Sequence, residues 1–151
     1  MIYRLLFLLL TMILRLEHIG IAVNDPEKSQ ELFDLLLDRK SYKSELVDSE
    51  GVKTIFYKSG ESKIELVASA SEENAIQNYL EKKGEGIHHL AFEVDDIYAT
   101  MLEMEDKGFQ ILNKQPKRGA DNKLIFFLHP KSTNGVLIEF CQSVKEDQAG
   151  L

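Results

Sequence analysis

Two stretches of this chain repeat one another, and this repeat restricts the possible folds more than any other feature. Segments 16–25 and 86–97 align so that His18 falls on His89. Each segment alternates apolar residues as a β-strand does, and then reaches an Asp-containing turn. A helical pattern follows in both places, at 28–37 and at 97–107. The repeat therefore predicts one structural unit that is used twice.

The ends of the two units agree with this alignment. Glu65 interrupts one short apolar strand and Glu139 interrupts another, 47 positions after His18 and 50 positions after His89, respectively. Two histidines and two glutamates thus recur at matching places, which is hard to attribute to unrelated surface residues. Mixed imidazole and carboxylate ligands suit Co, Mn, Fe, Ni or Zn better than they suit an all-thiolate structural zinc site. We therefore expect the four residues to bind a divalent metal.

The periodicity of each unit reads as strand, helix and three further strands. In the first unit we expect a strand at 14–23 and a helix that starts at 26 or 27 and has a broad buried face over 29–37. Strands are expected at 44–47, 54–57 and 63–67. In the second we expect a strand from Gly86, a helix at 96–107, and strands at 109–112, 123–128 and 135–141. Asp25 is expected to cap the first helix, and Gly84 to end a connector helix between the units.

This pattern predicts a single α+β domain. Its expected boundaries are 13–142 for the domain, 13–70 and 86–142 for its two modules, 71–84 for the connector helix and 143–151 for a polar tail. Segment 1–12 is treated separately, because it contains an apolar run that is too short to span a bilayer. We expect it to be an upstream extension, either from a misassigned start or as an anchor, and no other membrane association is expected.

Composition excludes some classes of function. The net charge of −7, from 18 basic and 25 acidic residues, argues against nucleic acid as a partner, because no basic stripe could neutralise phosphates. The one cysteine, Cys141, cannot form an internal disulfide, so the fold does not need oxidising conditions and a cytoplasmic location is expected. Cys141 lies on an apolar strand, where we expect a buried small hydrophobe rather than a nucleophile.

Two other histidines lie near the expected site. His88 precedes His89, and neighbouring strand residues point to opposite faces, so His88 is expected to face away from the metal. His129 lies where a strand runs into a turn at the expected mouth of the site. Lys131, two residues later, can meet an anionic substrate or remain a solvated loop lysine.

Three motifs carry a resemblance to a known family. Segments 18–23, 84–97 and 127–139 resemble the methylmalonyl-CoA epimerases, which belong to the vicinal oxygen chelate (glyoxalase-like) superfamily. The resemblance implies paired βαβββ modules whose curved mixed sheet encloses a metal ion, and a homodimer that acts on a small acyl-CoA. Co²⁺ is the expected metal, with Mn²⁺, Ni²⁺ or Zn²⁺ as alternatives. The implied metal ligands are the four residues found from the repeat, namely His18, Glu65, His89 and Glu139.

The implied reaction moves a proton at C2 of methylmalonyl-CoA and so exchanges its R and S configurations through a metal-stabilised enolate. Glu139 resembles one catalytic acid/base of the family. The second departs from the best-matched pattern, because Thr54 stands where some relatives have glutamate and cannot take up a proton at neutral pH. Glu50 is the expected substitute, with Glu65 or a water molecule as alternatives.

The resemblance also implies substrate contacts and suggests competing functions. Positions that line the acyl-CoA end of the family's pocket match Gly119, Ala120, Lys131 and Ser132. A lactoylglutathione lyase (glyoxalase I) of the same fold is an alternative function, and a non-catalytic small-molecule binding member of the superfamily is another. The last two motifs favour the epimerase over the lyase, and the presence of all four ligands counts against the binding protein.

Overall fold

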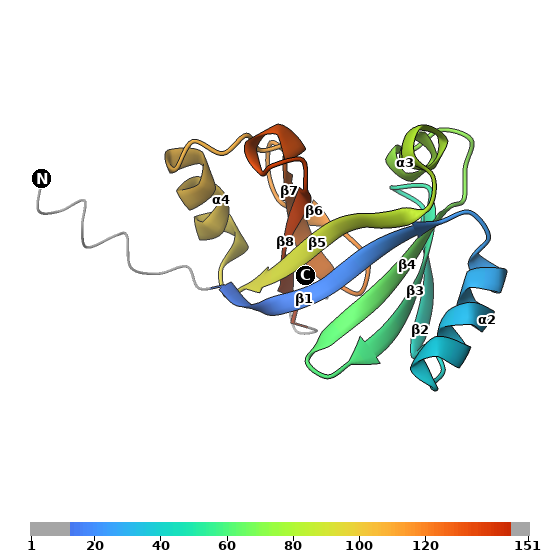
Figure 1. Cartoon of the computed structure of the whole chain (residues 1–151). Coiled ribbons are helices and arrows are strands. Elements are labelled where there is room, and N and C mark those ends of the chain that lie inside the picture. Colours follow the sequence, from blue (N-terminus) through green and yellow to red (C-terminus); the bar gives the residue numbers. More distant parts are fainter. Residues whose placement is uncertain (1–12, 146–151) are drawn as a thin grey trace, which may run out of the picture.

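Residues 13–145 are described by the computed structural model, and they fold into two βαβββ units that share one mixed sheet (Figure 1). The predicted extension at 1–12 lies outside these residues, as does most of the predicted tail. The first unit consists of β1 (Ile13–Val23), α2 (Pro26–Leu37), β2 (Lys43–Val47), β3 (Val52–Ser59) and β4 (Ser62–Ser69). The second consists of β5 (Gly86–Val94), α4 (Ile97–Asp106), β6 (Lys117–Arg118), β7 (Lys123–Leu128) and β8 (Leu137–Ser143).

The connector is α3 (Ala75–Lys83), and a short 3₁₀ helix, η1 (Pro130–Ser132), lies between β7 and β8. The strand order is β2-β3-β4-β1-β5-β8-β7-β6, so the opening strands of the two units meet at the centre of the sheet. β1 and β5 pair antiparallel, whereas each pairs in parallel with the last strand of its own unit. The sheet curls, as the glyoxalase-like prediction requires (Figure 1).

The helices begin and end where local chemistry satisfies their free backbone groups. The Asp25 side chain accepts a hydrogen bond from the Lys28 amide at 3.1 Å, and Asp96 does the same for the Ala99 amide at 3.0 Å. Gly84 ends α3 with a φ of 76°, a conformation that favours glycine. The predicted caps are confirmed. Among residues 13–145, no helix is long and apolar enough to cross a membrane.

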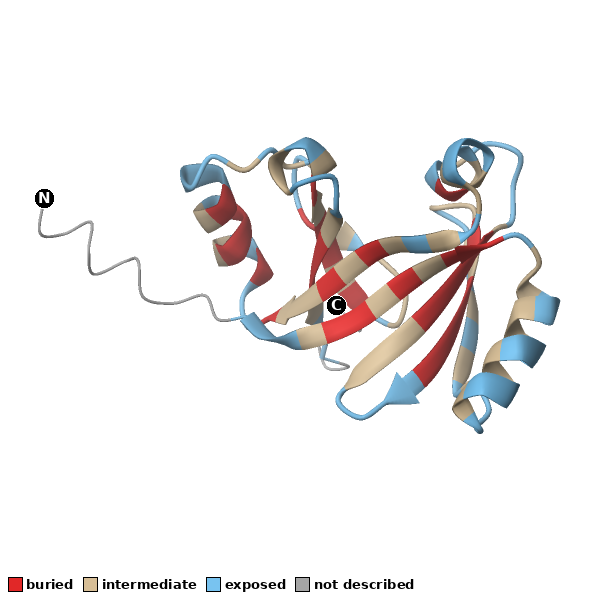
Figure 2. Cartoon of the chain, in the orientation of Figure 1, coloured by how far each residue is buried: buried red, intermediate tan, exposed pale blue. Residues whose placement is uncertain are grey.

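Each unit has a hydrophobic core of its own on the helix-covered side of its half-sheet (Figure 2). In the second unit, three residues of α4, Ile97, Met101 and Met104, are buried in a cluster with residues of β7 and β8. In the first unit, α2 contributes only Phe33 and Leu37, both partly buried. The predicted broad buried face of α2 is therefore wrong. Its other leucines face outward, with exposed fractions of 60% for Leu32, 81% for Leu35 and 67% for Leu36, because the helix rests on the sheet by one side only.

The predicted strand at 109–112 is also wrong, since this segment makes only an isolated bridge from Ile111 to Leu128. The side chain of Asn113 accepts the hydrogen bond of the Phe127 amide at 2.9 Å, which interrupts backbone pairing along β7. Pairing resumes at β6, between the segments predicted as strands at 109–112 and 123–128. Cys141 is fully buried, as predicted, and burial raises the pKa of its thiol.

Candidate metal centre

The antiparallel pairing of β1 with β5 brings the two repeated histidines together. His18 lies opposite Ala91, and Gly20 lies opposite His89, two residues further along the same strands. Residues two apart on a strand share a face, so both imidazoles project from the same side of the sheet. A local two-fold axis near the Ile19–Leu90 pair relates the His18–Ala91 pair to the His89–Gly20 pair.

The parallel neighbours of these strands bring in the two glutamates. β4 places Glu65 beside Gly20, and β8 places Glu139 beside Ala91. Each carboxylate therefore starts from the strand next to a residue with a minimal side chain, and it can reach across that residue toward the histidines. The sequence repeat thus becomes a symmetric set of four side chains on one face of the sheet.

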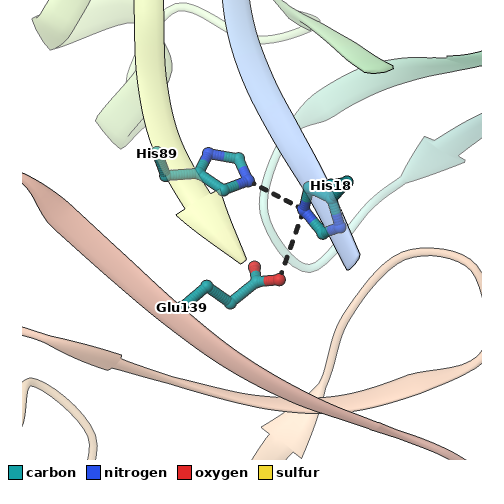
Figure 3. A group of neighbouring side chains, drawn as sticks. All are labelled: His18, His89 and Glu139. Carbon is teal, nitrogen blue, oxygen red and sulfur yellow. Dashed lines mark hydrogen bonds and ion pairs between the residues drawn. The ribbon is translucent and has the colours of Figure 1, made fainter. Parts of the chain in front are cut away.

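The donor atoms of these side chains converge. His18 Nε2 lies 3.0 Å from His89 Nε2 and 3.1 Å from Glu65 Oε2. Glu65 Oε2 is also 3.2 Å from His89 Nε2, and Glu139 Oε2 is 3.3 Å from His18 Nε2. All four residues are buried. Figure 3 shows His18, His89 and Glu139, whose donor atoms all lie within 4.8 Å of one another.

A divalent metal fits this arrangement. Ligand atoms that share a metal at about 2.1 Å lie about 3 Å apart at adjacent coordination positions, and the four contacts given above run from 3.0 to 3.3 Å. Two imidazoles with two carboxylates form a donor set for Zn²⁺ or another first-row metal. The structure therefore brings together all four predicted ligands in a geometry that can hold a metal.

The electrostatics of the centre also favour a cation. Burial acts to lower the pKa of His18, but the carboxylates of Glu65 and Glu139 outweigh it and raise that pKa well above its usual value. Burial acts to raise the pKa of Glu65, yet the adjacent His18 and His89 hold it well below its usual range. Burial raises the pKa of Glu139. A buried pair of carboxylates thus stabilises positive charge at the point where the donor atoms meet.

Gly20 makes room for the ring of His89. A Cβ atom at position 20 would lie 2.0 Å from Cε1 of His89, closer than any real contact. The group that approaches this glycine so closely is the imidazole on the facing strand.

We expect Gly20→Ala to weaken Co²⁺ binding by roughly tenfold or more, because a ligand must be held within about 0.5 Å of its working position. Isothermal titration of Co²⁺ measures the effect. Gly86→Ala is the matched control, since a Cβ there would meet only the Tyr79 hydroxyl at an ordinary 3.8 Å. Equal affinities for the two variants would show that Gly20 does not position the ring.

Glu17, which the sequence pattern does not single out, lies just before His18 and is buried. Its Oε2 forms a hydrogen bond with His18 Nδ1, the ring nitrogen that faces away from the centre. Its Oε1 forms an ion pair with Lys63 Nζ at 2.6 Å. Burial opposes ionisation, but His18 and Lys63 lower the pKa of Glu17 to about 2. The alignment of the two units is the sequence signal that points to Glu17, because it places Glu17 on His88, and each of these residues directly precedes a repeated histidine.

His88 does not face away from the centre, and that prediction is wrong. The pairing of β1 with β5 shifts by one residue between Gly20 and Ile21, which leaves His88 as the extra residue of a β-bulge. His88 Nδ1 lies 2.9 Å from His89 Nδ1. Burial and the adjacent His89 lower the pKa of His88 to about 4. Strict alternation fails at a bulge, so His88 and His89 border the same cavity.

This cavity has a volume of about 290 Å³ and lies beside the centre. Glu65, His89 and Glu139 supply its polar wall. Most of the remaining surface is apolar, from both units and from α3, and it includes Val52, Val67, Ile76, Ile125, Phe127 and Leu137. A small molecule bound here would have one end at the metal ligands and the rest against hydrocarbon.

Other predicted site residues fall into two groups. Glu50, Gly119 and Ala120 line the cavity, as does Thr54. Glu50 forms an ion pair with Lys117 across the two units, and both side chains are partly exposed. Lys131 and Ser132 lie in η1 and do not line the cavity.

Comparison with known proteins gives consistent matches over most of the chain. Residues 17–127 match the glyoxalase/bleomycin resistance protein/dioxygenase superfamily. An ethylmalonyl-CoA/methylmalonyl-CoA epimerase from Cereibacter sphaeroides is 38% identical over 133 residues, which cover 87% of this chain and 99% of that protein.

Comparison with solved structures gives matches of the same kind. The crystal structure of methylmalonyl-CoA epimerase from Mycobacterium tuberculosis has a TM-score of 0.85 and 31% identity, covering 89% of this chain and 91% of that one. A methylmalonyl-CoA epimerase in complex with methylmalonyl-CoA and NH₄⁺ has a TM-score of 0.83 and 32% identity, covering 88% and 96%.

Proposed function

This chain belongs to the glyoxalase/bleomycin resistance protein/dioxygenase superfamily, and we propose that it is a metal-dependent epimerase that interconverts the R and S forms of methylmalonyl-CoA. The observation that carries the proposal is the convergence of two imidazoles and two carboxylates beside an apolar cavity. The proposed substrate is the one in the names of similar proteins. We propose Co²⁺ as the native metal and a homodimer as the working assembly, following the resemblance.

The reaction requires a base at C2 of the substrate, between a thioester and a carboxylate. A metal held by the four donors would supply Lewis-acid stabilisation of the negative charge that develops when the C2 proton leaves. Glu139 is the proposed acid/base, because its carboxylate lies in the polar wall of the cavity, next to the other three donors. Its carboxylate takes the proton from one face of C2, and a second group returns a proton to the opposite face.

Glu50 is the proposed second group. It lies in the turn after β2, whereas Glu139 belongs to β8, so the two carboxylates approach the same cavity from different units. Thr54 also lines this cavity, and its hydroxyl donates a hydrogen bond to the Glu45 carbonyl at 3.3 Å. Glu65 or a bound water are the alternatives for returning the proton.

We assign residues to both ends of the bound substrate. Gly119 and Ala120 border the cavity, and we assign them to the acyl end. Lys131 and Ser132 are assigned to the anionic part of coenzyme A. Their turn is held by His129, whose Nδ1 accepts a hydrogen bond from the Lys131 amide at 3.0 Å. The apolar wall suits the methyl group at C2 and excludes water from the developing carbanion.

The test is isotope exchange. Purified protein loaded with Co²⁺ is incubated with methylmalonyl-CoA in D₂O, and deuterium at C2 is followed together with the ratio of epimers. We expect metal-dependent exchange that stops when the metal is chelated. If the protein binds metal without exchange, the epimerase assignment fails, and the methylglyoxal–glutathione reaction is the next assay.

If Glu139 and a water molecule suffice for the two proton transfers, Glu50→Gln should lower kcat by less than about tenfold. The ion pair with Lys117 occupies this carboxylate, and water can return the proton in its place. The matched control is Glu27→Gln, which breaks a similar ion pair, with Lys53 at 3.1 Å. A loss of roughly several hundredfold would instead identify Glu50 as the indispensable second acid/base.

A further inference from the structure

The two histidines of the centre are each preceded by a residue that departs from the regular sheet. Pairing between β1 and β5 shifts at two places near the local two-fold axis, between Leu16 and His18 and between Gly20 and Ile21. Glu17 is the extra residue at the first shift, and His88 is the extra residue at the second. The symmetry of the two units therefore maps one bulge onto the other. A bulge re-aims its side chain toward the neighbouring position.

Both re-aimed side chains contact the same atom of their histidine. Glu17 Oε2 is hydrogen-bonded to His18 Nδ1, and His88 Nδ1 lies 2.9 Å from His89 Nδ1. In both histidines Nε2 is the atom that faces the other donors, at a mutual distance of 3.0 Å. Glu17 thus corresponds to the carboxylate that commonly orients a metal-bound histidine. His88 occupies the equivalent place beside the other ligand.

The chemistry of imidazole then fixes the direction of the second contact. A neutral imidazole that presents the Nε2 lone pair to a metal carries its proton on Nδ1. His89 Nδ1 must therefore donate, and His88 Nδ1 must accept with its own proton on Nε2. One hydrogen bond sets the tautomers of both rings.

We propose that His88 is a positioning residue, which accepts the Nδ1 proton of His89 and thereby holds His89 in the orientation and tautomer that bind the metal. The proposal rests on the metal site of the proposed function and does not depend on the identity of the substrate. It makes the two histidine ligands unequal, because His18 is supported by a carboxylate and His89 by a neutral ring.

The ring of His88 is itself fixed by the connector helix. Tyr79 of α3 packs edge-on against it, with ring centroids 4.9 Å apart. The Tyr79 hydroxyl donates a hydrogen bond to the Ile87 carbonyl at 2.8 Å, on the backbone just before His88. A chain of contacts therefore runs from α3 through His88 to His89. This support gives the acceptor nitrogen a defined position.

The test compares two substitutions that separate the acceptor from the ring. His88→Phe keeps a ring against Tyr79 and removes the acceptor, whereas His88→Asn keeps an oxygen acceptor near the position of Nδ1 and removes the ring. We expect His88→Phe to raise the Kd for Zn²⁺ by roughly 10- to 100-fold, and His88→Asn to remain within about threefold of wild type. Tyr98→Phe, the same substitution at an exposed ring of α4, should bind Zn²⁺ normally.

A second readout observes the proton directly. In ¹⁵N-histidine-labelled protein loaded with Zn²⁺, long-range ¹H–¹⁵N spectra should show His89 protonated at Nδ1 and His88 unprotonated at Nδ1. Far-UV circular dichroism establishes that the variants are folded.

Three results overturn the proposal. These are wild-type affinity in His88→Phe, equal losses in the Phe and Asn variants, and an unprotonated His89 Nδ1. A wild-type protein that fails to bind Zn²⁺ would remove the metal site as well. Zn²⁺ binding without epimerase activity would refute the proposed substrate alone, and the role of His88 would still be decided by the titrations.

Discussion

Glu139→Gln should abolish metal-dependent deuterium exchange at C2 of methylmalonyl-CoA, with kcat/KM lowered by at least about 10³-fold. The amide keeps the size of the side chain and an oxygen that can face the centre, but it cannot take up a proton. The loss therefore separates proton transfer from metal binding. The measurement is the rate of exchange in D₂O at saturating Co²⁺, with bound metal quantified in the same sample.

Glu93→Gln is a suitable control for this variant. Glu93 lies on β5, where it pairs with Arg15 at 2.9 Å, away from the donor atoms. It should exchange deuterium at the wild-type rate. Residual exchange above about a thousandth of the wild-type rate in Glu139→Gln, with metal bound, would mean that another group removes the C2 proton.

His89→Ala should lose the metal and the activity together while the protein remains folded. One of four converging donors disappears, and the carboxylate of Glu65 loses a partner at 3.2 Å. The strand itself should persist, because apolar residues such as Ala91 and Val94 hold β5 in the core. Metal content after dialysis, turnover and thermal unfolding are the three measurements.

His129→Ala provides the comparison with a histidine outside the centre, and it should retain its metal. Activity of His89→Ala in the absence of bound metal would refute the metal site, whereas global unfolding would refute the structural independence of this imidazole.

Much of the architecture could be predicted because the chain repeats itself. Aligned apolar strands and Asp-containing turns gave the order of elements in both units, and the helix caps at Asp25 and Gly84 followed from local backbone chemistry. The convergence of His18, Glu65 and His89 with Glu139 was predictable for the same reason. Equivalent positions in symmetric units come together when the first strands pair.

The misplaced residues have physical causes that periodicity does not encode. Alternation assumes a regular pleat and so predicts the wrong face for His88, because a bulge breaks that rule at one residue. The segment 109–112 has the composition of a strand, but Asn113 takes the amide that a strand would need. The outward leucines of α2 depend on how the helix rests on the sheet, which the pattern of the helix alone does not determine.

The pairing of His18 with Ala91 and of Gly20 with His89 also bears on ancestry. It is the contact pattern of two identical subunits across a two-fold axis, in which residue i meets residue j and j meets i. A half-length forebear with one histidine and one glutamate would complete this centre by self-association. Fusion of its duplicated gene frees each copy to mutate alone. Glu17 and His88 occupy equivalent positions but are different residues. Such a difference can arise in a tandem chain, whereas in a dimer of identical halves every substitution occurs in both copies.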